Sequence, residues 1–290
     1  MPRATRSQQG GAFEPGGGAP PGFSGGLGFP PLEPVLKRLL IALAGIWLST
    51  FLLGLSEGGS RFVAALFSVL GLDPDAWFSG PLFLPLWQPL TYALLHSASP
   101  WHLLGNALYL YFFGGLLIER IGERRFLWFL GAAVLLGGFG SLVWKLLLGV
   151  HSVTVGISAG ALAVVAAAAV LMPQTPVLLI LIPVPLYVLA LILVGLDLLG
   201  ALQQLAAVGR SGVDHFAHLA GAGFGFLAAR RGWIYLDPSK LWERRRLEAQ
   251  RAQRANDEER LDLLLARIHR EGIGALSEAE REFLKRMSQR

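Results

Sequence analysis

Four polar residues of this sequence lie inside long apolar stretches, where polar side chains are rare. His102 and Asn106 are four residues apart in "PWHLLGNALYLYFF", a spacing that places both on one face of a helix. Ser158 has small neighbours in "VTVGISAGALAVV", and His218 lies in "VDHFAHLAGAGFGFL". Because polar groups inside a membrane are costly, we expect these four side chains to mark a functional site.

The types of these residues are those of a nucleophilic catalyst. A serine hydroxyl attacks a carbonyl when an imidazole removes its proton, so Ser158 is the predicted nucleophile and His218 the predicted general base, then acid. The attacked carbonyl develops a negative oxygen, which the amide of Asn106 and an N–H of His102 would stabilise. Asp197 lies too far along the fifth apolar segment to complete a triad, so the sequence predicts a Ser–His dyad.

The composition indicates a membrane domain joined to a soluble tail. Of the 290 residues, 53% are hydrophobic and 16% are charged, whereas soluble domains contain about 25% charged residues. Between Phe126 and Val213 the only charged residues are Lys145, Asp197 and Arg210. The net charge of +5 comes from Lys and Arg beside apolar segments and in the tail, so it predicts no nucleic-acid partner. The absence of cysteine excludes disulfides and thiolate metal sites.

The apolar segments predict an all-α polytopic membrane protein with a bundle of six transmembrane helices. Each segment has close to the ~20 residues that cross a bilayer. The predicted spans are residues 36–55, 101–121, 126–148, 154–172, 184–205 and 214–231. Residues 56–100 are expected to form short interfacial helices that contain Trp and Pro. The segment "PVLLILIPVPLY" is interrupted by prolines and is expected to lie at the membrane edge.

The chain divides by composition into three parts. Residues 1–33 are rich in Gly and Pro and are predicted to be disordered, and residues 34–232 form the predicted membrane domain. Residues 233–290 form a charged tail, which is predicted to be a cytoplasmic helical hairpin. Its first helix ends at Gly272, and its second begins with the capping-box pair Ser277 and Glu280. A solvated charged tail without a partner is an equally open interpretation.

Basic residues predict the orientation of the spans. Lys and Arg precede the first predicted span, separate the second from the third, and follow the sixth. By the positive-inside rule, both termini are therefore expected in the cytoplasm. Spans two, four and six then begin at the outer face, which places His102, Asn106, Ser158 and His218 at a similar depth. The absence of a transit peptide rich in Arg and Ser favours a bacterial inner membrane over an organelle.

In its motifs the chain resembles the rhomboid intramembrane serine proteases, over residues of about 80–232. The family's motifs are H-x-x-x-N, G-x-S and A-H-x-x-G-x-x-x-G, and the matching residues are His102 with Asn106, Gly156 with Ser158, and Ala217–His218 with Gly221 and Gly225. The resemblance implies a six-span core with a cytoplasmic N-terminus and no metal or organic cofactor. It also implies, as partners, the lipid bilayer and transmembrane protein substrates that are cleaved near the outer face.

Three residues depart from the family's pattern. Ala159 replaces the glycine that follows the serine, and its methyl group is expected to open the contact between spans four and six slightly. Leu162 replaces an aromatic ring on which the histidine stacks in many members, and Gln88 replaces an arginine at a structural position. His96 and His215 are assigned to structural roles, His96 as a supporting histidine of the family.

The glycines of span six predict how the candidate residues come together. Gly221 and Gly225 form a small-xxx-small face that begins one turn beyond His218. In span four, Gly156, Gly160 and Ala161 are the expected partners of this face. Such close backbone contact would bring the serine and the imidazole within hydrogen-bond distance.

Two other classes of protein fit part of this pattern. A catalytically inactive rhomboid-like protein would use the same fold to bind or route membrane-protein clients, and the loss of Ser158 or His218 would be its signature. A small transporter or channel would distribute polar groups across the full membrane depth. In this sequence both residues are present, and the polar groups lie near one predicted face.

Overall fold

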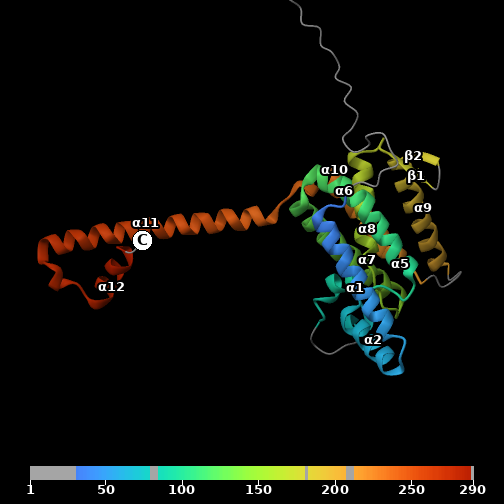
Figure 1. Ribbon diagram of the computed structural model, residues 1–290, viewed down its shortest axis with the longest axis horizontal. Coiled ribbons are helices and arrows are strands. Elements are labelled where there is room, and N and C mark those ends of the chain that lie inside the picture. Colours follow the sequence, from blue (N-terminus) through green and yellow to red (C-terminus); the bar gives the residue numbers. More distant parts are fainter. Residues whose placement is uncertain (1–30, 79–83, 180–181, 207–211, 289–290) are drawn as a thin grey trace, which may run out of the picture.

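The computed structural model describes residues 31–78, 84–179, 182–206 and 212–288. Helices dominate these residues, and they form a bundle from which one long helix extends (Figure 1). The predicted disordered segment, residues 1–33, lies almost entirely outside the described residues.

Helices occupy all six of the predicted spans. They are α1 (Pro34–Leu53), α5 (Pro100–Tyr109) with α6 (Gly115–Ile121), α7 (Glu123–Leu148), α8 (Ser158–Leu171), α9 (Leu186–Leu205) and α10 (His215–Arg230). A π-helical turn, Leu110–Gly114, joins α5 to α6 and makes them one continuous helix. The described residues therefore form a helical bundle, and the helix boundaries are within a few residues of those predicted.

Four of these six helices are long and apolar enough to cross a membrane, namely Pro34–Leu53, Pro100–Ile121, Glu123–Leu148 and Leu186–Leu205. Helices α8 and α10 are shorter, with 14 and 16 residues, or about 21 and 24 Å. These lengths are less than the ~30 Å hydrocarbon core of a bilayer.

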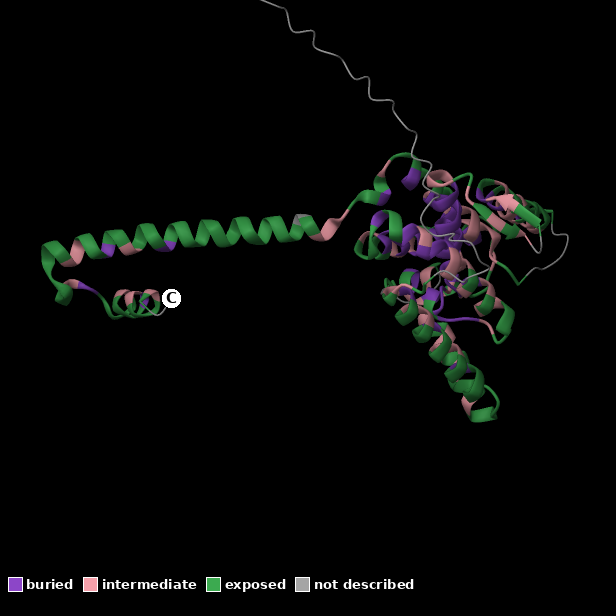
Figure 2. Cartoon of the chain, turned by 45° about the horizontal axis from the view of Figure 1, so that its top comes forward, coloured by how far each residue is buried: buried purple, intermediate pink, exposed green. Residues whose placement is uncertain are grey.

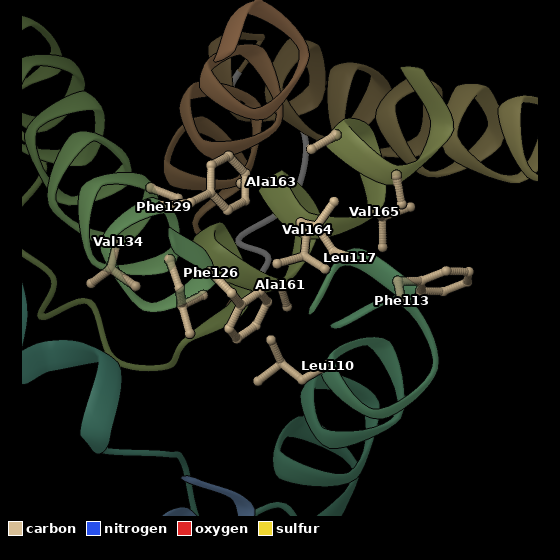
Figure 3. Close-up of a cluster of buried hydrophobic side chains, with 14 of the residues drawn as sticks. Leu110, Phe113, Leu117, Phe126, Phe129, Val134, Ala161, Ala163, Val164 and Val165 are labelled. Atoms are coloured by element: carbon tan, nitrogen blue, oxygen red, sulfur yellow. The ribbon is translucent and has the colours of Figure 1, made fainter. Parts of the chain in front are cut away.

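Helix α8 is the centre of the bundle. All its residues from Ala159 to Ala169 are buried, and most of them are alanine, which lets neighbouring helices approach closely. Figure 3 shows Ala161 and Val164 of this helix packed among larger side chains, such as Leu117 and Phe126, of the surrounding helices. Because α8 is enclosed by protein, its small side chains meet the bulky side chains of its neighbours instead of lipid.

The contact between α8 and α10 uses different residues from those predicted. A Cβ added to Gly221 would overlap the backbone carbonyl of Ala159, and one added to Gly225 would overlap that of Ala163. Gly160 instead faces Leu130 and Val134 of α7. The prediction that Gly156, Gly160 and Ala161 oppose the two glycines was therefore wrong, because Ala159 and Ala163 are the residues that contact them.

The methyl group of Ala159 does not separate α8 from α10. It lies against Gly137 of α7, where an added Cβ would overlap it, while the Ala159 carbonyl faces α10. The expectation that this methyl group opens the contact with α10 was wrong, because the methyl group packs on α7 and it is the backbone of Ala159 that contacts Gly221.

Short helices occur in the described part of residues 56–100, where short helices were predicted. They are α2 (Glu57–Leu70), α3 (Pro74–Phe78), α4 (Gln88–Thr91) and a 3₁₀ turn, Tyr92–Leu94. Gln88 is buried and holds this region together: its Oε1 accepts from the Asp73 backbone N–H and the Trp77 indole, and its Nε2 donates to the Ser68 carbonyl. The structural role predicted for this position is confirmed.

A β-hairpin interrupts the mainly helical fold of the described residues. Strands β1 (Pro176–Leu179) and β2 (Ile182–Pro185) pair in antiparallel register, with Val177 opposite Val184. The prediction of an all-α fold was wrong for this segment. Proline lacks a backbone N–H and disfavours helix, but a two-stranded hairpin has open edges where the missing donors are tolerated.

The C-terminal tail forms the predicted pair of helices. Helix α11 (Pro238–Glu271) ends at Gly272, and α12 (Glu278–Met287) begins with a capping box in which Ser277 and Glu280 bond each other's backbone N–H. Leu264, Leu276 and Phe283 form a small core between them. Figure 2 shows that most of α11 is exposed, whereas the buried residues gather in the bundle.

Candidate active site

Ser158 is the first residue of α8, and the backbone before it has an unusual conformation. Gly156 has φ +114°, a value that side chains rarely permit, and a Cβ added there would lie 2.7 Å from Nε2 of His102. Glycine is therefore required on both counts. As a result the chain that leads into Ser158 runs directly beside His102 and, at a slightly greater distance, the amide of Asn106.

His218 lies one turn into α10, and its ring faces Ser158. Its Nε2 is 2.7 Å from the Ser158 Oγ, a normal hydrogen-bond distance. Residues 60 positions apart in the chain are thus brought into contact. The close packing of α10 on α8 at Gly221, three residues beyond His218, is what permits this distance.

Asp197 of α9 also belongs to this site. Its Oδ1 is 2.8 Å from Nδ1 of His218 and 2.7 Å from Nδ1 of His215. The expectation that Asp197 lies too far along its span to reach His218 was wrong. Counting residues from a span boundary does not determine the relative height of two packed helices.

His102 and Asn106 lie on one face of α5, as predicted, and each has a neighbour that orients it. The Ser97 backbone N–H and hydroxyl lie 3.5 and 3.1 Å from Nδ1 of His102. Because a backbone N–H can only donate, Nδ1 is the acceptor and the neutral ring carries its proton on Nε2, beside Gly156. The Asn106 amide nitrogen donates to Nε2 of His96 over 3.2 Å.

His96 is a buried, neutral support for Asn106. It is 2% exposed, and burial, with a smaller contribution from the His102 imidazole, lowers the pKa of His96 to about 4. Above that pH its Nε2 remains available as the acceptor that orients the Asn106 amide.

A cavity of about 200 Å³ joins these residues. It is lined by Asn106, Tyr109, Ser158, Leu162, Leu193, Leu196, Asp197, His215 and His218. The leucines of α8 and α9 make the lining partly apolar, and the other lining residues are polar or aromatic. Tyr109 is one turn beyond Asn106 on the same helix face, and this spacing was the available signal for a residue that the sequence analysis missed.

A buried ion pair fastens the elements that carry Ser158 and His218. Nζ of Lys145 is 3.4 Å from the carboxylate of Asp214, and the two side chains are 4% and 13% exposed. Asp214 also caps α10 by accepting from the Ala217 backbone N–H, and it accepts from the hydroxyls of Ser141 and Thr154. The segment before Ser158 is thereby tied to the start of the helix that carries His218.

One cluster has ligand atoms close enough for a metal ion. Asp197, His215 and His218 present three such atoms within 4.8 Å of one another. Two hydrogen bonds of ordinary length already link these atoms, and His218 uses its second nitrogen for Ser158. The donor set thus has a complete explanation as a hydrogen-bonded chain of side chains.

Two family models match this chain. The family model described as the Rhomboid domain matches residues 85–235, which is just over half of the chain. A second model, for a family of unknown function (DUF6576), matches residues 247–290, which include most of α11 and all the described part of α12. A comparison with curated proteins finds no significant match.

Proposed function

The chain belongs to the rhomboid family, and from this premise we propose that it is an intramembrane serine endopeptidase. It is a multi-pass integral membrane protein, and in this proposal it cleaves transmembrane segments of other membrane proteins near the outer face of the bilayer. The observation that carries the proposal is the 2.7 Å contact between Nε2 of His218 and Oγ of Ser158.

The proposed reaction begins with acylation of Ser158. Its Oγ forms a bond to the substrate carbonyl carbon, its proton moves to Nε2 of His218, and the carbonyl electron pair moves to oxygen. The C–N bond then breaks, and His218 gives the proton to the leaving amine. Water next attacks the ester carbon and loses a proton to His218. The ester C–O bond then breaks, which releases the new carboxyl group, and His218 returns the proton to Ser158 Oγ.

Asn106 and His102 are proposed to stabilise the oxyanion. Asn106 lines the cavity with Ser158, and its amide has a second N–H besides the one that bonds His96. The Nε2–H of His102 lies beside Gly156, two residues before the nucleophile. Donors that are held by neighbouring side chains before the reaction starts stabilise developing charge most effectively.

The cavity supports a transmembrane segment as the substrate. Leu162, Leu193 and Leu196 give it apolar lining, and the lining comes from α8 and α10 and also from α5 and α9. A substrate passing between these helices would have to unwind, because peptide bonds inside a helix are shielded by their own hydrogen bonds. Substrates with Gly, Pro or Ser near the cleaved bond are therefore expected to react fastest.

The proposed topology has six spans and cytoplasmic termini, in a bacterial inner membrane. The four long apolar helices support four of these spans, and the distribution of Lys and Arg supports the cytoplasmic termini. In this topology the short helices α8 and α10 also count as spans. Helix α8 is enclosed by its neighbours, whereas α10 packs on α8 with one face and leaves Phe226 and Leu227 exposed.

The test uses purified protein in detergent, a fluorogenic transmembrane peptide and a fluorophosphonate probe. Ser158→Ala and His218→Ala should each abolish cleavage and probe labelling. Ser68→Ala and His151→Gln are the matched controls, since both residues are exposed outside the cavity, and both variants should behave as wild type. Labelling that persists in Ser158→Ala would show that the nucleophile is wrongly assigned.

A wild-type protein that binds transmembrane peptides but neither cleaves them nor reacts with the probe would instead be an inactive rhomboid-like protein that binds membrane clients.

A further inference from the structure

Asp197 is an acidic residue in the middle of an apolar helix, in the segment "LILVGLDLLGAL". Its side chain is 12% exposed, and its Oδ1 lies 2.8 Å from Nδ1 of His218 and 2.7 Å from Nδ1 of His215. An ionised side chain in such surroundings is costly unless it is paired. The two imidazoles supply that pairing.

The hydrogen bond to Asp197 determines which nitrogen of His218 carries the proton. An ionised carboxylate can only accept, so Nδ1 of His218 is the protonated nitrogen. Its Nε2 then has a free electron pair, and this is the nitrogen that faces the Ser158 hydroxyl. A general base needs this tautomer, because the opposite one would present an N–H to the nucleophile.

From these contacts we infer that Asp197 is a positioning residue, which holds His218 in its reactive tautomer and stabilises the imidazolium formed when His218 takes the Ser158 proton. The inference rests on the proposed function and extends the dyad to a chain of Ser158, His218 and Asp197. When the proton reaches Nε2, the positive ring is paired with a carboxylate 2.8 Å away, in a cavity with a partly apolar lining.

His215 holds the carboxylate from its other side. Its ring lies against Gly200, where an added Cβ would overlap the imidazole, and its Nδ1–H donates to the same oxygen that His218 uses. Gly200 follows Asp197 by three residues on α9, so both contacts with His215 lie on one face of that helix. The structural role predicted for His215 becomes specific: it orients Asp197.

Leu162 lines the cavity together with His218. A leucine side chain offers no flat surface on which an imidazole stacks. A carboxylate bonded to Nδ1 supplies the missing orientation of His218 by a hydrogen bond instead of by stacking.

The test compares Asp197→Asn, Asp197→Ala and Asp197→Glu with wild type in the cleavage assay, with kcat and KM determined separately. We expect Asn and Ala to lower kcat by about 10² to 10⁴-fold and to change KM by less than about threefold. Glu should restore part of the lost kcat, since it returns a carboxylate. Asp75→Asn is the matched control, because Asp75 also bonds a histidine but lies on the surface, and it should leave both constants unchanged.

Thermal unfolding of each variant separates positioning from folding. Asp197→Asn keeps the size of the side chain, so its unfolding temperature should stay close to that of wild type while kcat falls. His215→Gln, which retains an N–H donor, should lower kcat less than His215→Leu.

The possible results are distinguishable from failure of the proposed function. If wild type cleaves, Ser158→Ala does not, and Asp197→Asn has wild-type kcat, then the inference about Asp197 is wrong and the protease proposal stands. If wild type itself neither cleaves nor reacts with the probe, both proposals fall. If EDTA abolishes wild-type activity and Zn²⁺ restores it, the cluster is a metal site and the positioning role is refuted.

Discussion

The contact between α8 and α10 offers the sharpest test of how the fold positions the candidate catalytic residues. A Cβ added to Gly221 would overlap the Ala159 carbonyl, which is backbone and cannot rotate away. On the same helix, a Cβ added to Gly223 meets no described atom within 4 Å. Gly221→Ala and Gly223→Ala therefore add the same methyl group to the same helix, with contact in one case and open space in the other.

The structure determines the size of the expected effect. An ordinary contact begins at 3.4 Å, so Gly221→Ala must displace α10 from α8 by about 1 Å, and a misplacement of this size costs roughly 10²-fold in rate. The bond between His218 and Ser158, now 2.7 Å, would lengthen to about 3.7 Å, beyond hydrogen-bond range. Overpacking should also destabilise the domain by about 1–3 kcal/mol.

The assay measures kcat/KM for a fluorogenic transmembrane peptide, the rate of fluorophosphonate labelling, and thermal unfolding in the same detergent. Gly221→Ala should lose about 10²-fold in both rates, whereas Gly223→Ala should stay close to wild type. Gly225→Ala, which overlaps Ala163 one turn further from His218, should affect stability more than rate. Equal activity of the Gly221 and Gly223 variants would refute the claim that this contact sets the distance between serine and histidine.

Three other predictions address residues around the site and in the tail. Lys145→Met leaves the buried Asp214 carboxylate without its cation and should lower the free energy of unfolding by about 3–5 kcal/mol, as measured by thermal unfolding. Adding Asp214→Asn to this variant should recover most of that loss. Equal stability of the single and double variants would contradict this prediction. The pKa of His96 is lowered to about 4, so protonation favours the unfolded chain, and stability should fall by about 2–3 kcal/mol between pH 6.5 and pH 4.5. His96→Gln, which can still accept from Asn106, should show a smaller loss over that range, and an identical pH dependence would count against the assignment. Ser277→Ala removes a cap of α12 and should lower the local stability of that helix by about 1 kcal/mol. Amide hydrogen exchange should then be several-fold faster in α12 but unchanged in the bundle. Unchanged exchange in α12 would argue against the capping box.

Much of the architecture follows from local sequence patterns. Apolar runs of sufficient length locate six helices, because a chain in an apolar medium must satisfy its backbone hydrogen bonds within each helix. The capping box at Ser277 and the helix end at Gly272 could also be predicted from the sequence, because both depend on residues within one turn. The pairing of His102 with Asn106 on one face is likewise a consequence of helical spacing.

Other features depended on relations between helices. The face of α10 was evident from Gly221 and Gly225, but its partners proved to be Ala159 and Ala163. Small residues occur on every side of α8, so composition did not indicate which side faces α10. The hairpin at 176–185 was missed for a related reason, since prolines exclude a helix without specifying what replaces it.

The sequence by itself determined the helices and the apolar character of the bundle, because each helix is encoded within a single segment. It also predicted Ser158, His218, His102 and Asn106 as candidate site residues. Only the tertiary structure decided that Asp197 lies beside His218 and that His215 holds it there. The physical reason is that the height and rotation at which two helices pack are set by side-chain interlocking along their whole contact. No pattern within either helix contains that information.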